Sequence, residues 1–312
     1  MESFRLATSV VLPLVVYMML GSSLRKTGVI SLHACREMNS AIFKIFIPLS
    51  LFFNIYEAKI DEVFRADVFC FVIIAILVLF CVTYFAGRRM ITDKSDAATV
   101  IQGIYRSNFV LFGVAVAAPL CSGTGLATVG ALSAFVVPLI NMLAVILFET
   151  MNGGNVNKMQ IFKNILKNPL VIAGILGMIC SLLQVKFPVL LEGPLKTLGN
   201  MATPLALVIL GGMLSFESIR KHKMYLIVVT VCRLVIVPIV MLTAGYAIGL
   251  RGEMLIVVLS VAAAPTAVAS APMAQTMGGN AELASEIVAV TTVFSVFSIF
   301  GFVFVLAGLG MI

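Results

Sequence analysis

Apolar runs of about 20 residues alternate with short polar segments along the whole chain, and a helix of about that length crosses a lipid bilayer. The longest polar stretch, ETMNGGNVNKMQIFKNILKN at 149–168, is too short to fold as a domain. The pattern therefore predicts ten membrane-spanning helices. Their approximate ranges are 6–24, 38–56, 67–87, 97–119, 127–149, 168–186, 195–216, 224–250, 253–276 and 283–309.

Composition supports this interpretation. Hydrophobic residues make up 61% of the chain and charged residues 11%, with a mean hydropathy of +1.13, whereas soluble domains carry about 25% charged residues. We therefore expect an all-α integral membrane protein. The net charge of +7 fits basic cytoplasmic loops better than a nucleic-acid partner. The six cysteines have no short spacing that would predict a metal site or a disulfide framework.

Lysine and arginine residues are distributed unevenly between the two sets of loops. Loops after odd-numbered spans carry Arg25, Lys26, Arg36, Lys44, Arg88, Arg89, Lys94, Lys158, Lys163, Lys167, Arg220, Lys221 and Lys223. The opposite side carries Arg5, Lys59, Arg65, Lys186, Lys196 and Arg251. Because cytoplasmic loops are enriched in basic residues, this distribution predicts a multi-pass protein of the cell membrane with both termini outside the cytoplasm.

Short motifs recur at one fixed separation. The repeated pairs are Pro13–Val15 with Pro169–Val171, Leu20–Gly21 with Leu176–Gly177, and Pro48–Leu49 with Pro204–Leu205. Each pair is separated by 156 residues, which is half of the 312-residue chain. Each half holds five predicted spans, so the second half must enter the membrane in the opposite direction. This is an inverted-topology repeat, an architecture found in many secondary transporters.

Two predicted spans contain residues that interrupt a helix. The ninth span, within SVAAAPTAVASAPMAQTMGGN at 260–280, contains Pro265, which lacks a backbone donor and clashes with the preceding turn. The 156-residue offset relates Asn108 and Phe109 of the fourth span to Ala264 and Pro265, so the polar Arg106–Asn108 segment corresponds to the Ala264–Thr266 segment. We therefore expect two broken helices whose free ends bind a ligand, the N-terminal ends favouring an anion. A simple packing kink is the alternative, and Pro272, which has no counterpart, is expected to be a kink or a helix-end proline.

Two arginines lie inside predicted spans, where a charge is costly unless it faces a cavity or a partner. Arg106 could attract an anionic substrate. We favour a structural role next to the helix break, or a role in setting the local electrostatic potential. Arg233 could pair with Glu286, either as a structural ion pair or as part of proton coupling. Asn54 and Asn141 are candidate site residues because their helices should flank the crossing point, although asparagine often only bridges membrane helices.

Several functional classes lack their sequence signatures. The chain has no P-loop and no H-E-x-x-H motif, and His33 and His222 fall in predicted loops. No aspartate pair lies in the broken helices, which weakens a cation/proton antiporter interpretation. We therefore expect no enzyme activity, no catalytic residues, no metal and no cofactor.

Four segments resemble the auxin efflux carrier family of membrane transporters. They are YRSNFVLFG at 105–113, KNPLVIAGILG at 167–177, ATPLALVILGGML at 202–214, and 263–288 with its AAPTAVASAPMA motif. The resemblance covers essentially the whole chain. The long central hydrophilic loop of the plant members is missing, so the chain is similar to a compact prokaryotic member.

The resemblance implies ten helices in a fold similar to sodium/proton antiporters and bile acid symporters. It implies a scaffold from residues 1–60 and 168–219, a transport unit from 61–150 and 220–312, and a connecting loop at 151–167. Members are commonly homodimers. The substrate contacts carried over are Asn108, with its neighbour Ser107, Pro265, Thr266 and Asn141. Plant carriers have Asn-Pro-Asn where this chain has Arg-Ser-Asn, so its substrate need not be an indole acid.

Together these observations predict a secondary transporter that moves a small organic anion, auxin-like or a mono- or dicarboxylate, by an elevator-like movement. Proton coupling is left open. A membrane sensor or partner subunit that binds the ligand without moving it is one alternative. A sodium-coupled symporter is another, although few carboxylates lie within the spans.

Overall fold

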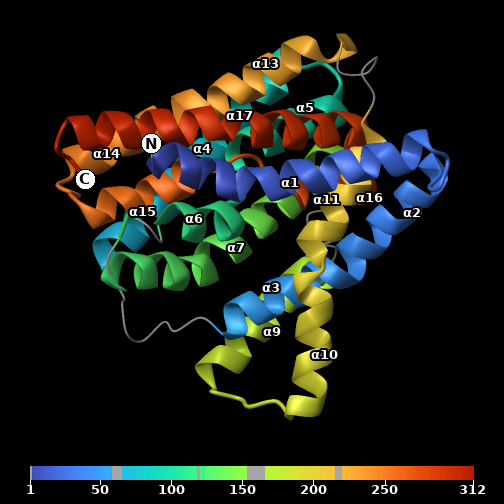
Figure 1. The fold of residues 1–312 in the computed structure, drawn as a ribbon, viewed down its shortest axis with the longest axis horizontal. Coiled ribbons are helices and arrows are strands. Elements are labelled where there is room, and N and C mark those ends of the chain that lie inside the picture. The colour runs from blue at the N-terminus through green and yellow to red at the C-terminus, as the bar shows by residue number, and fades with distance from the viewer. Residues whose placement is uncertain (1, 58–64, 118–119, 122, 153–165, 215–219) are drawn as a thin grey trace.

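The computed structural model describes residues 2–57, 65–117, 120–121, 123–152, 166–214 and 220–312. Within these ranges the named elements are helices joined by turns and short irregular segments, and the one β feature is an isolated bridge. The described parts of the ten predicted ranges are largely helical (Figure 1). The α-helices are α1 Glu2–Lys26, α2 Leu32–Ala41, α3 Ile47–Tyr56, α4 Ala66–Met90, α5 Lys94–Tyr105, α6 Phe109–Ala117, α7 Gly123–Asn152, α9 Pro169–Leu182, α10 Val189–Asn200, α11 Ala202–Met213, α13 Lys223–Val231, α14 Val237–Ala247, α15 Glu253–Ala262, α16 Ser270–Thr276 and α17 Ala281–Gly308. Two π-helical turns, η1 Ile42–Phe46 and η2 Cys232–Ile236, join α2 to α3 and α13 to α14.

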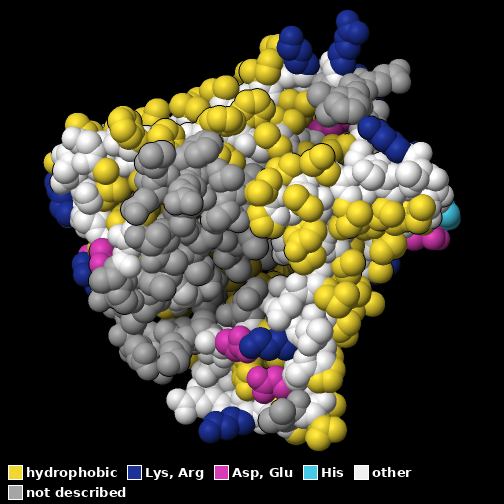
Figure 2. Space-filling model, in the orientation of Figure 1, with side chains coloured by type: hydrophobic (Ala, Val, Ile, Leu, Met, Phe, Trp, Pro, Cys, Tyr) yellow, Lys and Arg dark blue, Asp and Glu magenta, His cyan; other side chains and the backbone are white. Residues whose placement is uncertain are grey.

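Five helical segments of the described chain are long and apolar enough to cross a membrane. They are Ala66–Met90, Thr128–Met151, Leu190–Met213, Lys223–Ala247 and Ala281–Gly308. Large apolar side chains cover much of the outer surface, including Leu190, Val240 and Phe304, each more than half exposed. Figure 2 shows such side chains over the upper part of the molecule, where Figure 1 places α13, α14 and α17. An apolar exterior on apolar helices is the arrangement expected for contact with lipid.

One pair of helix ends is separated by the same offset as the motifs in the sequence. Lys26 ends α1 and Leu182 ends α9, 156 residues later. This pair of helix ends agrees with the correspondence between the two halves that the repeated motifs predict.

Two glycines at this offset make equivalent close contacts between helices. Gly21 brings α1 against α11, where a Cβ atom would lie 1.7 Å from the carbonyl oxygen of Val208. Gly177 brings α9 against α3, where a Cβ atom would lie 2.9 Å from the carbonyl oxygen of Phe52. Val208 and Phe52 are themselves 156 residues apart. Small residues allow this close approach of membrane helices, and here they do so at matching positions.

Both expected helix breaks are present, and they cross each other. The fourth span is divided into α5 and α6 by Arg106–Asn108, and the ninth into α15 and α16 by residues 263–269. Ser107 and Thr266 form an antiparallel bridge between the breaks. Around it, the Asn108 amide donates to the Pro265 carbonyl at 2.8 Å and the Ala267 amide to the Arg106 carbonyl at 3.1 Å. Pro272 lies in the first turn of α16, as expected for a helix-end proline.

Candidate functional site

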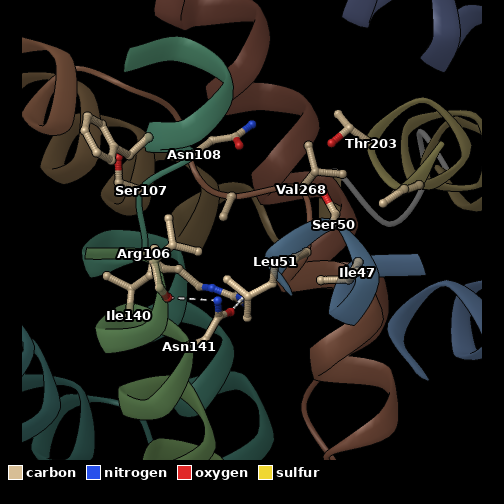
Figure 3. Close-up of a pocket in the computed structure, with 16 residues that line it drawn as sticks. Ile47, Ser50, Leu51, Arg106, Ser107, Asn108, Ile140, Asn141, Thr203 and Val268 are labelled. Carbon is tan, nitrogen blue, oxygen red and sulfur yellow. Dashed lines mark hydrogen bonds between the residues drawn. The ribbon is translucent and has the colours of Figure 1, made fainter. Parts of the chain in front are cut away.

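A cavity of about 130 Å³ lies beside the crossing point. Its wall combines the two breaks with α7 on one side and α3 with α11 on the other (Figure 3). The lining residues are Ile47, Ser50, Leu51, Arg106, Ser107, Asn108, Phe109, Val137, Ile140, Asn141, Ala202, Thr203, Ala206, Ala267, Val268 and Ala269. These described lining residues include one cation and no carboxylate.

Arg106 supplies that cation, and its side chain is almost entirely buried, at 1% exposure. One terminal nitrogen donates to the side-chain oxygen of Asn141, and the other lies 3.2 Å from the Met273 sulfur. The Nε atom has no hydrogen-bond partner among the described residues. No ion pair to a described carboxylate forms at this arginine, so its charge is balanced only by an amide and a thioether.

Asn141 holds the Arg106 guanidinium in place from α7. Its Nδ2 group donates to the Val137 carbonyl one turn earlier, at 2.9 Å, which directs the Oδ1 atom toward Arg106. In Figure 3 the Arg106 side chain extends to Asn141, while Ile47, Ser50 and Leu51 enter from α3. The amide therefore positions the cation at the cavity wall without neutralising it.

The N-terminus of α6 also opens onto this cavity. The first intrahelical bond runs from the Phe112 amide to the Asn108 carbonyl, so the amides of the first turn have no partner within the helix. Asn108 and Phe109 line the cavity, and the Asn108 Nδ2 atom is buried without a partner among the described residues. Amides without a partner in their own helix favour an anion at the helix N-terminus, and this positive potential adds to the charge of Arg106.

Carbonyl groups near the C-terminal ends of α5 and α15 accept hydrogen bonds from across the crossing. The Ser107 hydroxyl donates to the Val261 carbonyl, and the Thr266 hydroxyl donates to the Gly103 carbonyl, both at 2.7 Å. Each hydroxyl thus completes the last turn of the helix from the other half. Thr266 is fully buried and, like Pro265, is not among the residues that line the cavity. Both residues build the crossing, and Ser107 contributes to the wall.

Arg233 contacts the same helix ends rather than Glu286. Its guanidinium donates to the carbonyls of Ala264 at 2.8 Å, Val261 at 2.9 Å and Ile104 at 3.3 Å. A cation is favourable where helix C-termini converge, because their carbonyls carry partial negative charge. The predicted pairing of Arg233 with Glu286 is therefore corrected, since three carbonyls occupy the arginine.

Glu286 instead contacts His222. The His222 Nδ1 and Glu286 Oε2 atoms lie 2.9 Å apart, and both side chains are buried. The sequence placed His222 in a polar loop, but the residue forms the N-cap of α13 and packs against α17. Basic residues flank His222, and such a polar segment predicts an exposed loop. The hydrophobic pattern alone does not show which residue of a loop has a buried side chain.

One predicted site residue cannot be placed at the cavity, and two residues that line it were not predicted. Asn54 lies in α3, but its side chain is outside the described part of the structure. Ser50 and Thr203 line the cavity and were not predicted as site residues. Both stand close to the repeated prolines at 48 and 204, which was the available signal. The described residues contain no group of three or more His, Cys, Asp or Glu side chains that could hold a metal ion.

Comparison with known proteins supports a transport role. An uncharacterized transporter from Methanothermobacter thermautotrophicus is 24% identical over 297 residues, covering 94% of this chain and 96% of that protein. The family described as membrane transport protein matches residues 6–303, which is nearly the whole chain. The helical architecture, the apolar exterior and this match agree, and the chain belongs to the membrane transport protein family.

Proposed function

We propose that this protein is a secondary transporter of a small organic anion, which binds at the crossing of the two broken helices. The carboxylate of the substrate contacts Arg106 and the first turn of α6. Asn108 and Asn141 provide polar contacts, and the apolar side chains of α3 and α7 surround the remainder of the molecule. The single guanidinium matches one carboxylate group, and a second carboxylate would need another partner.

The observation that carries this proposal is the environment of Arg106. A buried charge costs several kcal/mol unless it is paired or coordinated, yet the described residues around this arginine provide no carboxylate. Arg233 shows that the same chain satisfies a buried arginine with three carbonyls where the role is structural. The Nε atom of Arg106, which has no partner among the described residues, and the position of this arginine at a cavity wall support the proposal that it binds an anionic ligand.

An elevator mechanism accounts for the position of the cavity. Its wall is divided between α3 and α11, which belong to the predicted scaffold, and the breaks with α7, which belong to the predicted transport unit. A relative movement of the two units would carry the bound anion across the membrane. The recurring offset of 156 residues supports an inverted repeat of five plus five spans, which gives such a protein two related conformations. The resemblance to auxin efflux carriers favours a carboxylate as the transported group.

A thermal-stability screen of the detergent-purified protein against small mono- and dicarboxylates tests the binding site. A ligand of the folded state at 100 times its Kd stabilises the protein by about 2.7 kcal/mol. We expect at least one carboxylate to raise the melting temperature of the wild type. Arg106→Gln should abolish this increase because it removes the cation.

Asn141→Asp provides a sharper variant. It places a carboxylate on Arg106 with almost no change in volume, so the protein should fold while the apparent affinity for the carboxylate falls about tenfold or more, equivalent to about 1.4 kcal/mol. Asn200→Asp on the exposed end of α10 is the matched control and should bind as the wild type does. Equal affinity in the wild type and Asn141→Asp would refute the site.

Transport is measured with the same carboxylate in liposomes. Saturable uptake and counterflow, both lost in Arg106→Gln, support the transporter. Binding without counterflow would favour the non-transporting sensor or partner subunit, and a requirement for sodium would favour a symporter.

A further inference from the structure

A second cavity, of about 450 Å³, lies away from the crossing point. It is enclosed by the end of α1, the start of α2, the end of α11 and the start of α17. Figure 1 shows α1 ending and α2 beginning at the right-hand side of the molecule, close to α16. Two arginines, Arg25 and Arg36, and one carboxylate, Glu282, lie on its wall.

The two arginines are available to a ligand. Arg25 is partly buried, and its Nη1 atom is buried without a hydrogen-bond partner among the described residues. Neither arginine forms an ion pair with a described carboxylate, and Glu282 does not pair with them. Both arginines line the same cavity, and guanidinium groups provide the planar arrays of donors that bind phosphate oxygens in pairs.

The N-terminus of α17 adds a third source of positive potential. This 28-residue helix begins at Ala281, on the cavity wall. Its N-cap Asn280 accepts from the Leu283 amide at 3.0 Å, which leaves the preceding amides of the first turn without an intrahelical partner. Glu282 opposes this field, so we expect it to limit the affinity for an anion rather than prevent binding.

The cavity lies on the face that the lysine and arginine distribution predicts to be cytoplasmic. Basic pockets between membrane helices on that side bind the headgroups of anionic lipids. We propose that this cavity binds a phosphate group through Arg25, Arg36 and the first turn of α17. The phosphate comes either from an anionic phospholipid of the cytoplasmic leaflet or from free phosphate.

A phosphate bound there would connect two parts of the molecule. Arg25 and Arg36 belong to the predicted scaffold, whereas Ala281 belongs to the predicted transport unit. Resting on the proposed elevator mechanism, this connection would slow transport by holding the two units together. The binding site itself is independent of that mechanism, because none of its residues lines the cavity at the crossing point.

The experiment measures the melting temperature of the full-length protein in detergent against three probes. These are inorganic phosphate, dioctanoyl phosphatidylglycerol and, as the comparison, dioctanoyl phosphatidylcholine, whose phosphate is already paired with its own choline cation so that the lipid has no net charge. We expect phosphatidylglycerol, inorganic phosphate or both to stabilise the wild type more than phosphatidylcholine does. Arg25→Gln and Arg36→Gln should each raise the concentration for half-maximal effect about tenfold, because each removes a charge-assisted contact.

Two further variants keep the test decisive. Arg89→Gln removes the same charge from the exposed end of α4 on the same predicted face, and should respond as the wild type does. Glu282→Gln removes the opposing carboxylate and should lower the half-maximal concentration, an improvement that a misfolded variant cannot produce. A response to phosphatidylglycerol alone identifies the lipid as the source, and a response to inorganic phosphate identifies a site for the free ion.

Equal responses in the wild type, Arg25→Gln and Arg36→Gln would overturn the proposal, as would a wild type that none of the anionic probes stabilises. Arg106→Gln should keep the phosphate response while losing the carboxylate response. Failure at one cavity is thereby distinguished from failure at the other.

Discussion

Arg106 and Arg233 are equally buried, each at 1% exposure, but their guanidinium groups have different surroundings. Arg233 donates to three backbone carbonyls at the converging ends of α5 and α15. Arg106 stands at a cavity wall with an asparagine and a methionine as its contacts. We therefore expect Arg233 to contribute mainly to stability and Arg106 mainly to ligand binding.

Arg233→Met should destabilise the fold strongly. The change leaves up to three buried carbonyls without this donor, and each unsatisfied group costs about 1–3 kcal/mol. Melting in detergent should show a large loss of stability without added ligand. Arg233→Lys keeps the charge but not the planar donors, so its loss should be intermediate. Unchanged melting of Arg233→Met would show that water or a rearranged backbone replaces the guanidinium.

The broken helices form a reciprocal structure rather than two separate kinks. The hydroxyl from each break completes the last turn of the helix in the other half, and the bridge between Ser107 and Thr266 joins the breaks. Around this crossing, α1 packs on α11 and α9 packs on α3. Gly21 and Gly177 contact residues that are also 156 positions apart, Val208 and Phe52. The distance from an added Cβ atom to the facing carbonyl oxygen is shorter at Gly21.

The two glycines should consequently respond unequally to alanine. Gly21→Ala places a methyl group 1.7 Å from the Val208 carbonyl oxygen, whereas Gly177→Ala places it 2.9 Å from that of Phe52. Overpacking costs about 1–3 kcal/mol and occasionally more, so Gly21→Ala should cost about 3 kcal/mol or more and Gly177→Ala less. Gly130→Ala in α7, where the new methyl group meets no atom within 4 Å, is the control and should melt at or above the wild-type temperature. Equal melting of all three variants would contradict the tight packing of α1 on α11.

The molecule as a whole places two cavities between the predicted scaffold and the predicted transport unit. The cavity beside the crossing point and the second cavity, which we propose binds phosphate, each combine residues from the two groups of helices. The groups also meet where Asn39 of α2 donates to the side chain of Gln275 in α16, at 2.8 Å. In Figure 1, α1 begins and α17 ends toward the same end of the molecule, which agrees with the predicted even number of spans.

Fusion reporters test the predicted orientation in the membrane. Alkaline phosphatase joined after Ile312 should be active and a fluorescent protein at the same position dark, because the C-terminus is predicted to lie outside the cytoplasm. A truncation after Thr92, in the basic loop between α4 and α5, should give the reverse result. Fluorescence at Ile312 and phosphatase activity at Thr92 would invert the topology and place the phosphate cavity outside the cytoplasm.

Local features of the chain predicted much of this architecture. Apolar runs long enough for a bilayer located the helical spans, because burial in lipid requires apolar side chains and internally bonded backbone. Pro265 and the polar Arg106–Asn108 segment predicted the helix breaks. Proline lacks a backbone N–H donor, and buried polar groups require hydrogen-bond partners. The offset between repeated motifs predicted which breaks correspond, and the structure places them together.

Partner choice at those breaks depended on contacts between residues far apart in the chain. Ser107 and Val261 are 154 positions apart, and Arg233 could be satisfied by a carboxylate or by carbonyls. The residue types alone do not rank these partners, because several acceptors suit one guanidinium equally well. The packing of the helices places three carbonyls around Arg233 and Glu286 next to His222. It also places Ser50 and Thr203 at the wall of the cavity. Local chemistry is enough to locate spans and breaks, but the pairing of buried charges follows from which helix ends the fold brings together.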